Sequence, residues 1–478
     1  MSLIPFVVLV ALIFLIIKYF GADALSGASQ VALIIASGVT IAIGLIFYRR
    51  RWEDIDEGIT ANIKGIGSAL IILLLIGAIG GTWMVSGIVP TLICYGLKVL
   101  SPRIFLFACC IICALVSLMT GSSWTTIATL GVALIAIGTA LGYSEAWTAG
   151  AIISGAYFGD KISPLSDTTV LASSSAGTPL FTHIRYMMIT TVPSITISLI
   201  IFLVTSLGHP VATDAGATML TASLKETFHI SPWLLTVPVI TGIMIAKKVP
   251  AMLTLLSAAI MAGITALIAQ PGLVSGIGGG ADILDFETGF KGIFQVIFGE
   301  TALQTGNSSV DELVRTGGMN GMLPTVFLII CAATYGGTLK GCGMVKSLTD
   351  ALTSRIKSRT SLVGATVGTG LMSNIIMGDQ YLSIILTCSI FKELYEKEGY
   401  EGRLLSRSTE DAATVTSVLI PWNSCGMTQA TVLRVPTLTY LPYCFFNIIS
   451  PMMSIFIAAI GYKIVKRKTV PGAVTEEQ

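Results

Sequence analysis

Four aspartates are the residues most able to do chemistry, because they lie inside apolar stretches of the chain. Asp160 and Asp167 belong to "SGAYFGDKISPLSDTT" (154–169), Asp379 to "MSNIIMGDQYLS" (372–383) and Asp411 to "LSRSTEDAATVTSVLIPWNSCG" (405–426). A charge at membrane depth costs at least about 2.5–3.5 kcal/mol on insertion scales, so it usually has a function there. Carboxylate, hydroxyl and carbonyl oxygens suit a small hard cation. We therefore interpret the four aspartates as candidate sodium ligands.

Two of these stretches carry a helix breaker. Pro164 cannot donate its share of the helical hydrogen bonds, and Gly159 permits a bend nearby. Pro421 occupies the corresponding place in the second stretch. A break inside lipid frees backbone groups that need partners, so it persists where those groups line a cavity. We predict two broken helices, over about 146–175 and 407–430.

Two further stretches, 102–141 and 360–396, carry a polar turn at the centre and are predicted to be re-entrant helical hairpins. Their tips, "MTGSSWTT" (119–126) and 372–383, would face the two breaks. The candidate ion- or substrate-binding residues are Thr120, Gly121, Ser122, Ser123, Thr125, Asp160, Ser163, Asp167, Thr168, Asn374, Asp379, Ser383, Asp411, Asn423 and Ser424.

Structural roles compete with these assignments. Ser, Thr and Asp at helix breaks are also ordinary helix caps, which applies above all to Thr125, Thr126, Thr169 and Thr416. Asp160 could form a structural ion pair with its neighbour Lys161. Trp124 and Trp422 could pack or could line an organic pocket.

Composition identifies a polytopic membrane protein. The chain has 478 residues, of which 53% are apolar and 11% charged, with a mean hydropathy of +0.84. Soluble domains carry about 25% charged residues. The nine cysteines cannot all pair, and most lie in apolar runs, so we expect free thiols. No HExxH or GxSxG motif and no basic nucleic-acid-binding pattern occurs. We therefore expect neither an enzyme, nor a cofactor, nor a nucleic-acid partner.

The predicted fold is all-α, with about ten transmembrane helices, two of them broken, and two re-entrant hairpins. Unbroken spans are expected at about 3–20, 30–48, 65–87, 187–208, 231–247, 249–270, 321–338 and 441–462. Most of the 28 Lys and Arg fall in the segments that are cytoplasmic when both termini are cytoplasmic, which favours that orientation. The acidic stretch 271–320 is then an external loop.

The two halves repeat at an offset of about 257 residues. The matching positions are Gly121 with Gly378, Gly142 with Gly399, Pro164 with Pro421, Pro179 with Pro436 and Tyr186 with Tyr443. Equivalent positions fall on opposite sides of the membrane, which predicts the inverted repeat typical of secondary transporters. The expected organisation is a helix pair (1–58), a first repeat (59–208), connecting helices with the external loop (209–320), a second repeat (321–465) and a cytoplasmic tail (466–478).

The repeat is symmetric in shape but not in charge. Each aspartate of one half corresponds to a serine of the other: Asp160 to Ser417, Asp167 to Ser424, Asp379 to Ser122 and Asp411 to Ser154. Serine can offer an oxygen to a cation but cannot carry a proton. We infer that only some of the four positions exchange charge during transport.

At these residues the chain resembles the NhaC-type sodium/proton antiporter family. The stretches "GSSWTT", "GAYFGDKISPLSDTT", "HIRY", "YLSI", "LSRSTEDAATVTSVLIPWNSCG" and "LPYCFF" carry the resemblance. It implies secondary transport in the bacterial inner membrane, driven by sodium and proton gradients. Relatives of this family also carry malate, lactate or amino acids.

Two functions remain open at this point. In sodium/proton antiport, Asp160 and Asp167 would hold sodium on one side, and Asp379 and Asp411 would complete an opposite site. Desolvation favours the neutral form of a carboxyl group, so proton and sodium would compete for it. In sodium- or proton-coupled transport of a small organic solute, that solute would sit between the hairpin tips. Lys161 is the only strong cation expected there, which disfavours dicarboxylates. The remaining partners are the lipid bilayer and a possible second copy of the chain.

Overall fold

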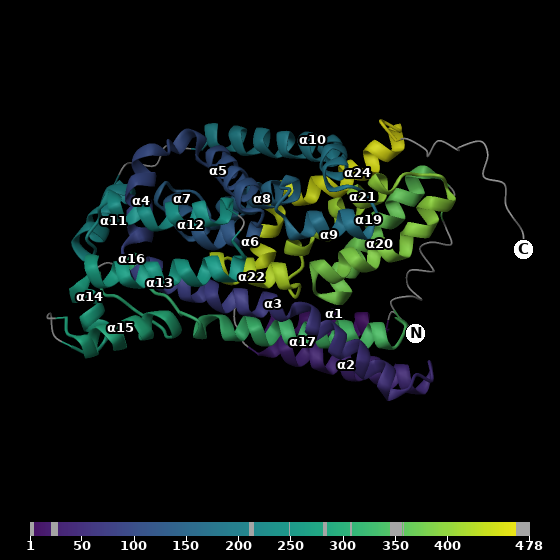
Figure 1. Ribbon diagram of the computed structural model, residues 1–478, viewed down its shortest axis with the longest axis horizontal. Coiled ribbons are helices and arrows are strands. Elements are labelled where there is room, and N and C mark those ends of the chain that lie inside the picture. The colour runs from purple at the N-terminus through teal and green to yellow at the C-terminus, as the bar shows by residue number, and fades with distance from the viewer. Residues whose placement is uncertain are drawn as a thin grey trace, which may run out of the picture.

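The computed structural model describes residues 4–20, 27–209, 215–247, 249–280, 284–305, 308–344, 356 and 358–464. The predicted tail, 466–478, lies outside these residues. The described residues form helices and turns, with an isolated antiparallel bridge between Thr301 and Thr316. Most of the long helices run along the longest axis of the molecule (Figure 1). The nine cysteines are free and buried, as expected.

The first half contains an unbroken helical core and one broken helix. Its helices are α1 (Ile4–Phe20), α2 (Ala28–Ile46), α3 (Trp52–Val85), α4 (Ile88–Val99), α5 (Phe105–Thr120), α6 (Ser123–Thr126), α7 (Val132–Ala140), α8 (Glu145–Ile162), α9 (Asp167–Ser175) and α10 (Leu180–Leu207). A π-helical turn, Ile127–Gly131, joins α6 to α7. The chain is non-helical between α8 and α9, where Pro164 lies, so the first predicted break is confirmed.

The second half repeats this plan. Its helices are α17 (Leu323–Gly341), α19 (Arg359–Met377), α20 (Gln380–Lys397), α21 (Gly402–Thr409), α22 (Ser424–Leu433), α23 (Thr437–Tyr440) and α24 (Phe445–Ile460). A π-helical turn, Glu410–Thr414, follows α21. The short 3-10 helix Ser417–Leu419 precedes the gap that holds Pro421, which confirms the second break.

The connecting region is more helical than the sequence suggested. It contains α11 (Ala215–Thr227), α12 (Thr236–Ala246), α13 (Ala251–Ala269), α14 (Pro271–Ile277), α15 (Phe286–Phe298) and α16 (Ser308–Val314). The last three lie in 271–320, which we expected to be a loop. Glycine-rich joints and the short length of these helices hid them from a search for spans of about 20 residues.

Some of the helices that can span a membrane are not the expected ones. Among the described residues, eight helices are long and apolar enough to cross a membrane, or ten if two bent pairs are each counted once. Three of the eight are arms of the predicted hairpins: Pro102–Thr120, Ser123–Ala140 and Arg359–Met377. These arms are therefore long enough to cross a membrane themselves. The fold class, an all-α polytopic membrane protein, is confirmed.

The backbone itself carries the repeat. Left-handed conformations recur at the predicted offset: φ is 67° at Gly121 and 64° at Gly378, and 85° at Gly142 and 77° at Gly399. A third pair, Gly177 at 66° and Arg434 at 58°, was not noticed in the sequence because arginine replaces glycine. Positive φ is sterically costly for residues with a Cβ, so three matched turns indicate one shared backbone plan.

Equivalent helices run in opposite directions, which makes the repeat an inverted one. α10 and α24 lie side by side along one edge of the molecule (Figure 1). Tyr186, near the start of α10, donates to the carbonyl of Lys463 just beyond α24, at 3.1 Å. Phe202, near the end of α10, packs against Phe445 at the start of α24, with ring centroids 5.3 Å apart.

α3 and α17 form a second antiparallel pair at the opposite edge. A Cβ added to Gly58 would lie 2.6 Å from the carbonyl oxygen of Gly337, and one added to Gly77 would lie 2.4 Å from that of Gly318. Small residues let membrane helices approach closely, so glycine sets the spacing of this pair. The hairpins and broken helices lie between these two edges (Figure 1).

Candidate functional site

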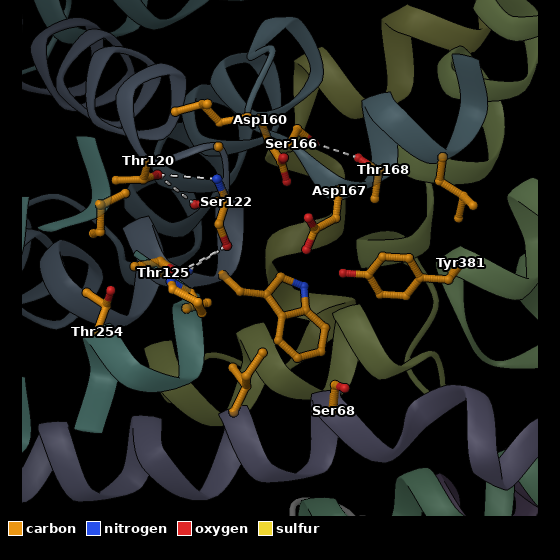
Figure 2. Close-up of a pocket in the computed structure, with 18 of the residues that line it drawn as sticks. Ser68, Thr120, Ser122, Thr125, Asp160, Ser166, Asp167, Thr168, Thr254 and Tyr381 are labelled. Carbon is orange, nitrogen blue, oxygen red and sulfur yellow. Dashed lines mark hydrogen bonds between the residues drawn. The ribbon is translucent and has the colours of Figure 1, made fainter. Parts of the chain in front are cut away.

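A large cavity lies where the first hairpin tip meets the first helix break. Its volume is about 760 Å³. Among the predicted site residues, those that line it are Thr120, Gly121, Ser122, Thr125, Asp160, Asp167 and Thr168. Figure 2 shows the side chains of Ser122, Thr125, Asp160 and Asp167 gathered around this space. The structure therefore brings these seven predicted residues to one cavity, and their role in binding stays a prediction.

Asp160 is the buried acid of the cavity. Its side chain is near the end of α8, and the residue is only 5% exposed. The backbone N–H of Ser123 donates to Oδ2 at 3.0 Å, and the Ser123 hydroxyl donates to the same oxygen at 2.7 Å. The hairpin tip thus holds one carboxylate oxygen in place. The predicted pairing of Asp160 with Lys161 is wrong.

Asp167 is the exposed acid of the same cavity. It is the first residue of α9, whose amide of Thr169 is capped by the Ser166 hydroxyl at 3.4 Å. Because Ser166 fills the capping role, the Asp167 carboxylate is not needed for it. In Figure 2 this carboxylate and the Tyr381 hydroxyl point toward the same part of the cavity.

The freed backbone around the first break has side-chain partners. The Thr169 hydroxyl donates to the carbonyl of Lys161 at 3.0 Å, and Ser163 donates to that of Leu118 at 2.8 Å. Thr169 therefore bonds back across the break, as the structural alternative proposed. Ser163 ties the break to α5.

The second hairpin tip and second break form a closed polar network. Asp379 caps α20 by accepting from the amide of Leu382 at 3.1 Å, and its other oxygen accepts from the Ser424 hydroxyl at 3.1 Å. Asn423 donates to the carbonyl of Asn374 at 3.1 Å. The Ser383 hydroxyl donates to the carbonyl of Asp379 at 2.7 Å. These five predicted residues are brought together, with every one of them buried.

Asp411 does not join Asp379. It accepts hydrogen bonds from Lys161, from Thr190 at 3.1 Å and from Ser450 at 3.1 Å, and it is fully buried. Lys161 also donates to Ser450 at 2.9 Å. The expected site that combined Asp379 with Asp411 is therefore corrected: Asp411 neutralises the lysine that follows Asp160.

A second buried acid and base accompany that pair. Glu410 and Arg407 are both fully buried, and within the described part of the chain neither carboxylate oxygen of Glu410 has a hydrogen-bond partner. The Arg407 guanidinium stacks over the ring of Tyr186, 4.8 Å from its centroid. The burial of Glu410 could not be predicted from the sequence, because Glu410 lies near the predicted end of its membrane span.

Several residues of the cavity were not among the predicted site residues. Gln380 and Tyr381 directly follow Asp379 but line the first cavity, so the second hairpin contributes to both sites. Trp124 lines it as well, in keeping with the pocket alternative, whereas the Trp422 indole donates to the carbonyl of Ile375 at 2.7 Å. Ser68 of α3 and Thr254 of α13 complete the wall. Position in the fold alone identifies these last two.

Two contacts of the tips obey the repeat. Ser117 donates to the carbonyl of Ala156 at 2.6 Å, and its equivalent Asn374 donates to that of Ala413 at the same distance. The Ser123–Asp160 contact has its counterpart in the hydrogen bond from Ser417 to Gln380, at 3.5 Å. Both tips are therefore docked against the breaks in the same way.

One contact breaks the symmetry. Asp379 bonds Ser424, and the equivalent positions are Ser122 and Asp167. Among the described residues, no hydrogen bond joins Ser122 to Asp167, and both line the cavity instead. One side of the pseudo-symmetric site is thus closed by a hydrogen bond while the other is open.

The fold and this site define a class: a secondary transporter built from inverted repeats with broken helices that meet at an oxygen-rich centre. Among the described residues, no three His, Cys, Asp or Glu side chains lie close enough to hold a metal ion together. The four aspartates therefore do not make a single cage. Hydroxyl and carbonyl oxygens would have to complete any sodium site.

The chain belongs to the Na+/H+ antiporter family, whose profile matches residues 1–177 and 155–462. It is 36% identical over 424 residues to the Na(+)/H(+) antiporter NhaC of Alkalihalophilus pseudofirmus, covering 89% of this chain and 88% of that protein. It is 34% identical to the malate-2H(+)/Na(+)-lactate antiporter of Bacillus subtilis, over 90% of this chain and 89% of the other. It is also 34% identical to the arginine/ornithine antiporter ArcD of Halobacterium salinarum, over 86% and 83%. The chain is a transporter of the cell membrane and not an enzyme.

Proposed function

We propose that this protein exchanges sodium for protons across the membrane by alternating access. The observation that carries the proposal is the position of Asp160. It is a buried carboxylate at a helix break, it is held by the hairpin tip, and it lines the cavity of about 760 Å³. The antiporter relatives support the same reading.

Sodium would bind at the cavity end of α8. Asp160 would supply the charge, Asp167 a second carboxylate, and Ser122, Ser123, Thr125 and Thr168 hydroxyl oxygens. A proton on either carboxyl group removes the charge that sodium needs. Sodium and proton therefore exclude one another, which converts two opposing fluxes into exchange without leak.

Alternating access would follow from the broken symmetry. In the second state, Ser122 and Asp167 would form the hydrogen bond, and Asp379 and Ser424 would separate and open a cavity toward the other side. Because the two halves share one backbone plan, exchanging these contacts exchanges the side that is open. The Lys161–Asp411 pair would stay buried in both states.

The orientation and assembly remain part of the proposal. We place both termini in the cytoplasm of the inner membrane, with domain limits at 1–58, 59–208, 209–320, 321–465 and 466–478. The cavity wall includes the α12–α13 junction at Val249 and Pro250, which follows the basic Lys247 in the sequence. Because basic residues favour the cytoplasmic side, we propose that the cavity opens toward the cytoplasm. A homodimer is compatible with this arrangement.

The experiment uses proteoliposomes loaded with a pH-sensitive dye. Adding sodium outside vesicles with an acidic interior should raise the internal pH when the wild-type protein is present. With Asp160→Asn, the rate of this pH change should be at least 100-fold lower. Asp285→Asn is the matched control. Asp285 caps α15, hydrogen bonds from Thr288 hold the pKa of its carboxyl below the usual range, and asparagine also caps helices. A normal rate in Asp160→Asn would refute the assigned role of Asp160.

A second candidate function is coupled transport of a small organic solute. The cavity volume of about 760 Å³ favours it, since a water molecule takes only about 30 Å³ of the liquid. The relatives named for malate, lactate, arginine and ornithine make such a solute plausible for this fold. The chemistry of the wall then decides which solute fits.

A further inference from the structure

The cavity is larger than a sodium ion requires, and its wall is acidic. Asp160 and Asp167 line it, and none of the described residues that line it is Lys, Arg or His. The remaining wall combines hydroxyl groups with the aromatic rings of Trp124 and Tyr381 and the apolar side chains of Ile72 and Leu171. An organic solute in this cavity would therefore meet two carboxylates and an apolar surface that can contact its hydrocarbon part.

The lysine that follows Asp160 in the sequence is not available to a bound solute. Lys161 is fully buried and directs its ammonium group to Asp411 and Ser450. Among the described residues that line the cavity, none offers a side-chain cation to a substrate carboxylate. Burying an unpaired carboxylate is costly, so anionic solutes are selected against.

The helix starts that point at the cavity do not supply the missing positive charge. The N-terminal amides of α9 and α20 could bind an anion in principle. Ser166 already accepts from the amide of Thr169, and Asp379 already accepts from that of Leu382. The second of these caps is itself an anion. Each of these helix starts therefore already has one amide capped by a side-chain oxygen, and at α20 that oxygen belongs to a carboxylate.

We propose that the cavity binds a small organic amine through its ammonium group, in competition with sodium. This inference rests on the proposed function, because it assigns a second cation to the same carboxylates. The ammonium group takes the place of sodium between Asp160 and Asp167, and the hydrocarbon body lies against the aromatic wall. Aromatic faces attract cations, which adds to the carboxylate contacts.

The charge argument ranks three solutes that share one hydrocarbon body. 2-Phenylethylamine carries the ammonium group alone, L-phenylalanine adds a carboxylate, and 3-phenylpropanoate carries the carboxylate alone. The order of affinity should follow the order of positive charge. Lactate and malate are anions, so we expect the cavity to exclude them as it excludes 3-phenylpropanoate.

The test measures binding to the purified full-length protein by thermal stabilisation and by displacement of ²²Na⁺. 2-Phenylethylamine should stabilise the protein and displace sodium. L-Phenylalanine should bind at least tenfold more weakly, and 3-phenylpropanoate should neither stabilise nor displace. Equal or tighter binding of 3-phenylpropanoate, or no binding of the amine, would overturn the proposal.

A variant that fills part of the cavity tests whether the amine binds there. Ser68 faces the cavity from α3, opposite the proposed sodium ligands (Figure 2). Ser68→Leu should weaken amine binding at least tenfold, because the larger side chain takes up space in the cavity. Unchanged amine affinity would place the amine outside the cavity and refute the proposal.

A second filling variant guards against misfolding. Gly65→Val uses the same helix, where an added Cβ would lie 3.5 Å from Leu382, in ordinary contact. Amine binding and proton flux are separate readouts. If the wild-type protein binds the amine but shows no sodium-driven proton flux, only the proposed sodium/proton exchange is wrong. If it shows this flux but does not bind the amine, only the amine proposal is wrong.

Discussion

Asp160 and Lys161 are neighbours in the chain with opposite surroundings. Asp160 faces the cavity and the hairpin tip, whereas Lys161 faces Asp411 behind α8. A single residue step, about 100° around the helix, thus separates a carboxylate that can meet an ion from a lysine that cannot. The sequence identified both charges as functional or paired, but not their directions, because the partner of Lys161 is 250 residues away.

The buried Lys161–Asp411 pair predicts a non-additive response to mutation. Lys161→Met removes the hydrogen-bonded cation of the buried Asp411 carboxylate and leaves it, among the described residues, only the ion pair with Arg407, 3.9 Å away, so this variant alone should cost about 3–5 kcal/mol of stability. The double variant Lys161→Met/Asp411→Leu removes both charges of the pair and should recover part of that loss, because Arg407 then loses its ion pair with Asp411. Thermal unfolding of the purified variants measures both effects, and a double variant no more stable than the single one would contradict the pairing.

At the scale of elements, the hairpin tips and helix breaks form the site together. The proline breaks and glycine turns were predictable, since proline and positive φ leave sequence signatures. The contributions of Ser68 and Thr254 were not, because serine and threonine in a helix have no signature of facing a cavity. The structural role of Asp411 was equally hidden in the sequence, since its contact with Lys161 depends on where the π-helical turn Glu410–Thr414 lies relative to α8.

The symmetry-related serines predict opposite shifts between the two states. Ser424→Ala removes the hydrogen bond to Asp379 that closes one side, and Ser122→Ala removes the equivalent bond of the other state. A hydrogen bond to a charged group contributes about 1.5–3 kcal/mol, enough to change a two-state population about tenfold or more. Ser424→Ala should therefore disfavour the open cavity described here.

The variant Ser68→Cys, combined with each serine variant, reports the change in the population of the open state. The measured quantity is the rate at which a water-soluble maleimide labels the new thiol. Ser424→Ala should slow labelling, and Ser122→Ala should speed it. The nine native cysteines are buried, so they give a low background. Equal shifts in the same direction for the two variants would argue against exchange of these contacts.

At the scale of the whole molecule, an inverted repeat places two similar gates around one centre. The antiparallel pairs α10–α24 and α3–α17 hold the two edges, and the tips and breaks between them carry the polar groups. The repeat could be predicted from the sequence, because glycine, proline and tyrosine recur at one offset in the two halves. Its differences in charge determine that one cavity is acidic and the other network is closed.

The measurement that tests the central claim most directly is sodium affinity as a function of pH. Purified wild-type protein is titrated with sodium by calorimetry at several values between about pH 6 and pH 9. If a proton and sodium compete for the cavity carboxylates, the apparent Kd should rise up to about tenfold for each unit of pH decrease in the acidic range, and Asp160→Asn should abolish the binding. A wild-type Kd that is the same across this range, or sodium binding retained in Asp160→Asn, would contradict the account.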